Sequence, residues 1–78
     1  MVNTTEVRTY TVVCNLHRYM DEQGLNITQL SKAIGITQNT IRSYVQNRFN
    51  RIDCEVAAKI CAHFDVSFGD MFEIAKGG

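Results

Sequence analysis

The sequence predicts a compact, mainly α-helical domain of five short helices preceded by one β-strand. Apolar residues recur three and four positions apart through residues 13–74, as on the buried faces of successive amphipathic helices. Residues that commonly cap helices precede four of these stretches, and glycines follow two of them. Residues 6–12 alternate in type and are rich in Thr, Val and Tyr, which favours a strand. At 78 residues the chain can bury one small core, so we expect a single domain.

In chain order, we expect the strand and the five helical elements at residues 6–12, 13–24, 27–34, 38–46, 54–64 and 68–72. Leu16 and Met20 lie one turn apart in the first helix, which Gly24 can end as a C-terminal cap. Four polar residues precede the later helices and can accept hydrogen bonds from their first turns: Asn26, Thr37, Asp53 and Ser67. Gly35 ends the second helix. The connection to the third helix is so short that these two helices must lie close together at a steep angle.

The third helix has an exposed face that lacks acidic residues. At 100° per residue, one side of the helix is apolar, with Ile41, Tyr44 and Val45. The opposite side carries amides, a hydroxyl and one arginine: Gln38, Asn39, Arg42, Ser43 and Gln46. The solvent side of the fourth helix, by contrast, has charges of both signs. The third helix therefore differs from an ordinary surface helix in the chemistry of its polar side.

The formal net charge is zero, but the charges are unevenly distributed. Residues 23–52 contain no acidic residue and four basic ones: Lys32, Arg42, Arg48 and Arg51. Residues 53–73 contain five acidic residues against Lys59 alone. This polarity favours a negatively charged partner, although four charges can also form a solvated face.

Amide and guanidinium groups are suited to reading base edges in double-stranded DNA. Asn or Gln can pair with adenine through two hydrogen bonds, and Arg can pair with guanine in the same way. Phosphates would repel acidic side chains, and none occurs on this face of the third helix. The alternative is a well-capped helix whose neutral side chains only face solvent.

The segment GLNITQLSKAIGITQNTIRSYVQN, residues 24–47, resembles the helix-turn-helix of the lambda-repressor-like family, also called the Cro or XRE type. The resemblance continues through RIDCEVAAKICAHFDVSFGDMFEI and covers residues 13–74. It implies a five-helix, lambda-repressor-like helix-turn-helix DNA-binding domain over residues 1–78, with the helix-turn-helix unit at about residues 27–46. One position departs from the family pattern. Ile27 stands where many members carry a glutamine that contacts phosphate.

The resemblance also implies roles for particular residues. Base contacts are expected from the start and exposed face of the recognition helix: Thr37, Gln38, Asn39, Arg42 and Ser43. Contacts to the DNA backbone are expected from the following loop: Asn47, Arg48, Asn50 and Arg51. Tyr44 is expected in the core or at its rim. Phe49 either pins the loop to the core, which we favour, or forms part of a partner surface.

The predicted function is sequence-specific binding of double-stranded DNA by a small cytoplasmic transcriptional repressor. No nucleophile–base pair or phosphate loop supports an enzyme, and we expect no cofactor. Cys14 and His17 have the spacing of a metal-binding pair, but no second pair completes a zinc site, so no metal is expected. No run of residues is long and apolar enough for a membrane span. The alternative function is a protein-binding module, such as an antitoxin or antirepressor. The sequence leaves open whether the chain forms a homodimer or binds a regulatory protein.

The N-terminal strand needs a partner, because an unpaired strand exposes a row of backbone N–H and C=O groups. The only other strand-like stretch is Met71–Ala75, in which Phe72 and Ile74 alternate with Glu73. We therefore predict that the two ends of the chain pair with each other. The pairing could occur within one chain or between two chains of a dimer.

Overall fold

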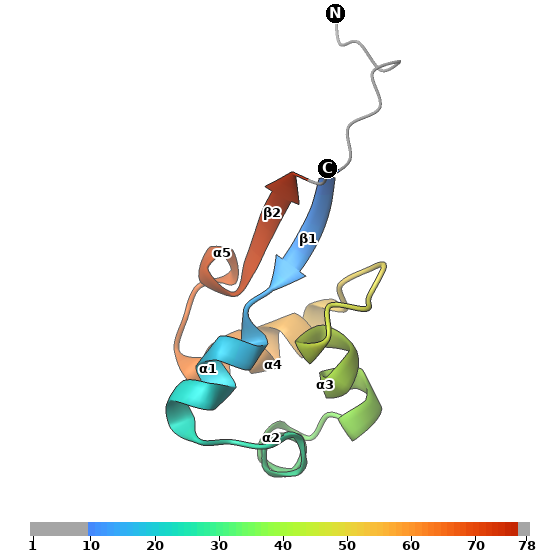
Figure 1. Ribbon diagram of the computed structural model, residues 1–78. Coiled ribbons are helices and arrows are strands. Elements are labelled where there is room, and N and C mark those ends of the chain that lie inside the picture. Colours follow the sequence, from blue (N-terminus) through green and yellow to red (C-terminus); the bar gives the residue numbers. More distant parts are fainter. Residues whose placement is uncertain (1–9, 77–78) are drawn as a thin grey trace, which may run out of the picture.

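The computed structural model describes residues 10–76, in which five helices lie between two terminal strands (Figure 1). In chain order the elements are β1 (Tyr10–Cys14), α1 (Leu16–Gln23), α2 (Ile27–Ile34), α3 (Gln38–Val45), α4 (Cys54–Phe64), α5 (Phe68–Met71) and β2 (Phe72–Lys76). The helices form the body of the domain, and the two strands extend from it as an antiparallel pair (Figure 1). The predicted mainly helical fold is therefore confirmed. None of the helices in residues 10–76 is long and apolar enough to cross a membrane.

All five helices contribute to one hydrophobic core. Each places one side chain at its centre with almost no exposed surface: Leu16, Leu30, Ile41, Ile60 and Met71. Burial of a side chain of this size stabilises the fold by about 1.5–3 kcal/mol relative to leaving it in water. Tyr44 is also buried, with 3% of its surface exposed, which confirms its predicted place in the core. Its hydroxyl oxygen accepts a hydrogen bond of 3.0 Å from the backbone N–H of Asp53, so its polar end is paired.

Local hydrogen bonds fix both ends of α2. The Asn26 side chain accepts a hydrogen bond from the backbone N–H of Gln29 at 2.7 Å, and the Gln29 side chain accepts one from the backbone N–H of Asn26 at 2.9 Å. This reciprocal pair is a capping box, which satisfies two N–H groups that a helix start leaves open. Gly35 ends the helix with φ 71°, a left-handed conformation that glycine adopts without steric cost. Both ends of α2 lie where the sequence predicts them.

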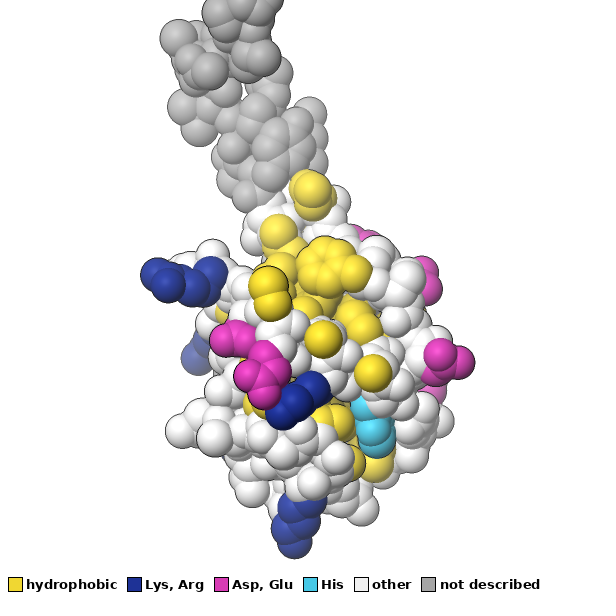
Figure 2. Space-filling model, turned by 180° about the vertical axis from the view of Figure 1, so that it is seen from behind, with side chains coloured by type: hydrophobic (Ala, Val, Ile, Leu, Met, Phe, Trp, Pro, Cys, Tyr) yellow, Lys and Arg dark blue, Asp and Glu magenta, His cyan; other side chains and the backbone are white. Residues whose placement is uncertain are grey.

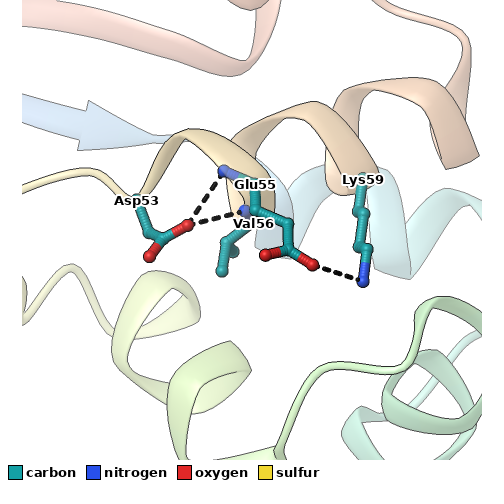
Figure 3. A network of polar contacts seen from close by, with 4 residues as sticks. All are labelled: Asp53, Glu55, Val56 and Lys59. Carbon is teal, nitrogen blue, oxygen red and sulfur yellow. Dashed lines mark hydrogen bonds and ion pairs between the residues drawn. The ribbon is translucent and has the colours of Figure 1, made fainter.

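The start of α4 is fixed by a carboxylate. One oxygen of Asp53 accepts hydrogen bonds from the backbone N–H groups of Glu55 and Val56 at 2.9 and 3.2 Å (Figure 3). In the first turn of the helix, Glu55 forms an ion pair of 2.9 Å with Lys59, which lies one turn further on (Figure 3). The carboxylates of Asp53 and Glu55 also face the positive end of the helix dipole. The predicted bounds of α4 are confirmed.

The two ends of the chain pair within one chain. β1 and β2 are antiparallel, in a register that runs from Tyr10↔Lys76 to Cys14↔Phe72. The predicted pairing is thus confirmed, but several boundaries were wrong. The second strand, expected at Met71–Ala75, is Phe72–Lys76, and α3, expected to reach about Gln46, ends at Val45. Val13 and Cys14, expected in a helix, belong to β1, because they pair with β2 and delay the start of α1 until Leu16. Phe72, expected to end the fifth helical element, is the first residue of β2. Residues 6–9 of the predicted strand lie outside the described residues.

Candidate nucleic-acid interface

The turn between α2 and α3 is held by side chains from both helices. The hydroxyl of Ser31 in α2 donates a hydrogen bond of 2.5 Å to the backbone carbonyl of Ile36 in the turn. The Thr37 side chain then accepts a hydrogen bond from the backbone N–H of Thr40, which caps α3. Both bonds join residues that are close in sequence, so local contacts set the angle between α2 and α3. This arrangement leaves the polar side of α3 facing outward.

The structure places the predicted base-contacting residues on that outward side. Ser43 is half-buried, and the other four are exposed: Thr37, Gln38, Asn39 and Arg42. Their hydrogen-bonding groups are not equally free. The Thr37 hydroxyl donates to that of Thr40 at 2.9 Å, and the Ser43 hydroxyl donates to the Thr40 carbonyl at 2.7 Å.

Three residues of α3 present most of the free hydrogen-bonding capacity. Gln38 has no side-chain hydrogen bond within the described part of the chain. Arg42 donates to the Asn39 side-chain oxygen at 3.0 Å, which holds the guanidinium beside the amide. The Asn39 NH₂ group remains available as a donor. This edge of α3 can therefore present an unconstrained amide next to a paired amide and guanidinium.

The loop after α3 carries the remaining predicted residues. Arg48, Asn50 and Arg51 are exposed. The loop lies on the same side of the molecule as α3, at its C-terminal end (Figure 1). The acidic residue nearest in sequence is Asp53, whose carboxylate is engaged by the start of α4. The surface formed by α3 and this loop thus combines polar side chains with positive charge.

Asn47 is placed differently from the other loop residues. Its side-chain oxygen accepts a hydrogen bond of 2.6 Å from the backbone N–H of Cys14, and its NH₂ group donates to the Cys14 carbonyl at 3.4 Å. Its backbone is left-handed, with φ 57°. Sequence reasoning missed this contact. An asparagine just past the end of a helix does indicate the left-handed backbone, but nothing in the sequence pattern indicates Cys14 as its partner.

Phe49 packs inward from the same loop. Its ring lies 4.8 Å from that of Tyr44 and 6.3 Å from that of Phe72, measured between ring centroids. This confirms that Phe49 pins the loop to the core.

Cys14 packs its thiol into the core. Its side chain is buried, and burial raises the pKa of its thiol to about 11. A thiol with this pKa stays protonated at neutral pH. Within residues 10–76 there is no group of three His, Cys, Asp or Glu side chains arranged to hold a metal ion.

Comparisons with known proteins agree with this geometry. Residues 15–77 match the Cro/C1-type HTH DNA-binding domain, and the chain therefore belongs to this family of DNA-binding domains. The resemblance seen in the sequence is confirmed. The crystal structure of the transcriptional regulator VanUg, form II, is similar, with a TM-score of 0.71 and 19% sequence identity. The similarity covers 99% of this chain and 100% of that chain, and at this identity it establishes a shared fold. No curated protein matches the chain.

Proposed function

We propose that this DNA-binding domain recognises a specific sequence in double-stranded DNA and acts as a small transcriptional repressor. The observation that carries the proposal is the exposed side of α3, where Gln38, Asn39 and Arg42 offer amide and guanidinium groups. These are the groups that distinguish base pairs in the major groove. The likeness in fold to VanUg, a transcriptional regulator, supports a regulatory role.

In this proposal α3 contacts the bases, and the loop that follows it contacts the DNA backbone. Base contacts come from α3 through Gln38, Asn39 and Arg42, with Thr37 and Ser43 beside them. Contacts to phosphates come from Arg48, Asn50 and Arg51, which supply affinity without sequence preference. Repression then needs only that the bound domain occupies a site that another DNA-binding protein requires.

The proposal is tested by selecting bound sequences from a random pool of duplexes and then measuring affinity across a range of salt concentrations. We expect one enriched sequence and a steep, linear fall of log affinity with log salt. Changing Arg48 or Arg51 to Ala should weaken binding to all sequences. It should also reduce the salt slope by about one for each phosphate that the protein no longer neutralises.

Two results would contradict this assignment. Weak binding at every salt concentration would support a protein-binding module instead, such as an antitoxin or antirepressor. An unchanged salt slope in both arginine variants would mean that the loop faces away from DNA.

An exposed apolar face favours a second element of the proposal, a homodimer. Val12, Phe68 and Ile74 are 39%, 55% and 74% exposed. A groove of ≈ 420 Å³ lies close by, lined by Ile52, Cys54, Ala57, Ala58, Cys61 and Phe68. Hydrophobic side chains gather over this side of the molecule in Figure 2. Contiguous apolar surface of this kind commonly marks a site of protein association.

A second copy of this chain is the occupant that we propose for the apolar face. α3 has eight residues, so it is about 12 Å long and can follow only a few base pairs. Two copies double the sequence that is read, which specific binding requires against many competing sites. We expect a dimer by sedimentation, a palindromic selected site with half-sites about 34 Å apart, and a monomer after Phe68→Ser. A wild-type chain that sediments as a monomer, both alone and on its selected site, would rule out the second copy.

A further inference from the structure

The end of α3 is closed by a Schellman motif centred on Asn47. The backbone N–H of Arg48 donates to the carbonyl of Ser43 at 2.8 Å, and that of Asn47 donates to the carbonyl of Tyr44 at 3.2 Å. This motif requires a left-handed residue at position 47, where φ is 57°. Glycine satisfies that requirement best, because a side chain disfavours the left-handed region. The presence of asparagine therefore points to a use for its side chain.

That use is visible in the contact with β1. The amide of Asn47 accepts from the N–H and donates to the C=O of a single residue, Cys14, at 2.6 and 3.4 Å. A side-chain amide has the donor and acceptor of a peptide group, so it pairs with the strand as a neighbouring strand would. Cys14 faces Phe72 on its other side. Asn47 thus joins the outer edge of the two-stranded sheet to the end of the recognition helix.

A second contact anchors the same loop to the same sheet. Phe49, two residues after Asn47, packs between Tyr44 of α3 and Phe72 of β2. Tyr44 in turn accepts the hydrogen bond from Asp53 where the loop ends. The loop is therefore tied to the sheet near its start and to the core at its end.

These anchors leave the charged residues of the loop on the outside. Arg48 lies between the two anchoring residues and is exposed, as is Arg51. A long arginine side chain contacts a phosphate at lower entropic cost when its backbone is already fixed. Asn47 itself has committed its side-chain oxygen and one side-chain N–H to Cys14, which leaves it poorly placed for a phosphate contact.

We infer that Asn47 is a positioning residue for DNA binding: it holds the loop against β1 so that Arg48 and Arg51 meet the DNA backbone. This replaces the phosphate contact that the sequence suggests for Asn47, and it rests on the proposed function of the loop. The sheet formed by the two chain ends thereby controls how firmly the recognition helix and its loop are held for DNA.

The test uses Asn47→Gly, which keeps the left-handed backbone and removes only the amide bridge. The matched control is Asp65→Gly, because Asp65 is also exposed and left-handed, with φ 56°, at the end of α4. Both variants should fold, since glycine suits this conformation, and thermal melting verifies this. In the free protein, the backbone amide of Cys14 should exchange with solvent at least about tenfold faster in Asn47→Gly than in the wild type or Asp65→Gly.

DNA affinity is then measured in a double-mutant cycle with a short duplex of mixed sequence. Asn47→Gly should weaken binding about tenfold in the wild-type background and less than about twofold in the Arg48→Ala/Arg51→Ala background. This non-additivity is expected because a positioning residue acts through the arginines.

Each contrary result has its own meaning. An equal loss in both backgrounds would make Asn47 a direct DNA contact and overturn the inference, as would unchanged affinity. If the Cys14 amide exchanges at the same rate in Asn47→Gly and in the wild type, the hydrogen bonds between Asn47 and Cys14 do not hold the loop, and the inference is refuted. A wild-type chain that does not bind duplex DNA would refute the proposed function, so the two kinds of failure are distinguishable.

Discussion

The helix-turn-helix pair, α2 and α3, and the two-stranded sheet are held by contacts of opposite range. The bonds that end and orient α2 and α3 join residues three to five positions apart, such as Asn26 with Gln29 and Ser31 with Ile36. The sheet depends on residues from opposite ends of the chain. Asn15, for example, donates to the Asp70 carbonyl and the Glu73 carboxylate, 55 and 58 positions away.

The two regions also differ in what they expose. The outward side of α3 carries polar groups over a fully buried Ile41. The sheet exposes apolar Val12 and Ile74, which face each other across the strands. The domain therefore separates the polar side of α3, whose orientation is set by local bonds, from a partly apolar end that depends on long-range pairing. Four measurements test this contrast.

The core beneath α3 should respond most strongly to substitution. Ile41→Ala should lower the free energy of unfolding by about 2–5 kcal/mol, because Ile41 has no exposed surface and its truncation leaves a cavity. Ile74→Ala is the matched control in the sheet. Ile74 is 74% exposed in the single chain, and its truncation should cost no more than about 0.5 kcal/mol when no second copy covers it. Urea titration in the Phe68→Ser background, where we expect a monomer, measures both variants, and similar losses would contradict the contrast between core and sheet.

The next effect concerns specificity. Gln38→Ala should weaken binding to the selected sequence by about 1–3 kcal/mol and leave binding to random DNA nearly unchanged. Gln23→Ala, an exposed glutamine in α1, should alter neither affinity. Fluorescence anisotropy with both duplexes gives the comparison. Equal losses on the two duplexes would assign Gln38 to the DNA backbone rather than to bases.

A smaller effect is expected at the cap of α3. Thr37→Ala should destabilise the domain by about 1 kcal/mol, because the N–H of Thr40 loses its side-chain acceptor. Thr28→Ala provides the control, since Thr28 is exposed inside α2. Thermal melting compares the two variants. Equal melting temperatures would contradict the conclusion that local bonds determine where α3 begins.

The sheet should respond least. Glu73→Ala removes one of the two acceptors of the Asn15 side chain and leaves the Asp70 carbonyl in place. Because the interaction is exposed, the loss of stability should be about 0.5 kcal/mol. Glu22→Ala in α1 serves as the reference, and urea titration measures both variants. A loss above that of Thr37→Ala would show that the long-range contacts dominate the stability of the domain.

The contrast in contact range explains how far the sequence predicts the fold. The bounds of α2 and the starts of α3 and α4 follow from capping residues that act within a single turn: Asn26, Gly35, Thr37 and Asp53. The change from strand to helix near Val13 does not follow from local pattern. Whether Val13 and Cys14 are extended depends on Glu73 and Phe72, their partners at the other end of the chain.

The same contrast applies to the candidate interface. The exposure of Gln38, Asn39 and Arg42 follows from helical periodicity, so the sequence places them correctly on the outward side of α3. The contact between Asn47 and Cys14 spans 33 positions. Composition and periodicity carry no information about such a pair. The base and backbone contacts themselves remain predictions.

The pairing of β1 with β2 also means that the order of the elements along the chain can be changed by circular permutation. Because Tyr10 and Lys76 are cross-strand partners, their α-carbons lie about 5 Å apart. A two-residue Asn-Gly turn could join them and convert β1 and β2 into a local hairpin. New ends could be opened at Gly24, which is exposed in the turn between α1 and α2. We expect such a circular permutant to keep the fold and the recognition helix. Its sheet would form early, because it would no longer depend on closing almost the whole chain into one loop.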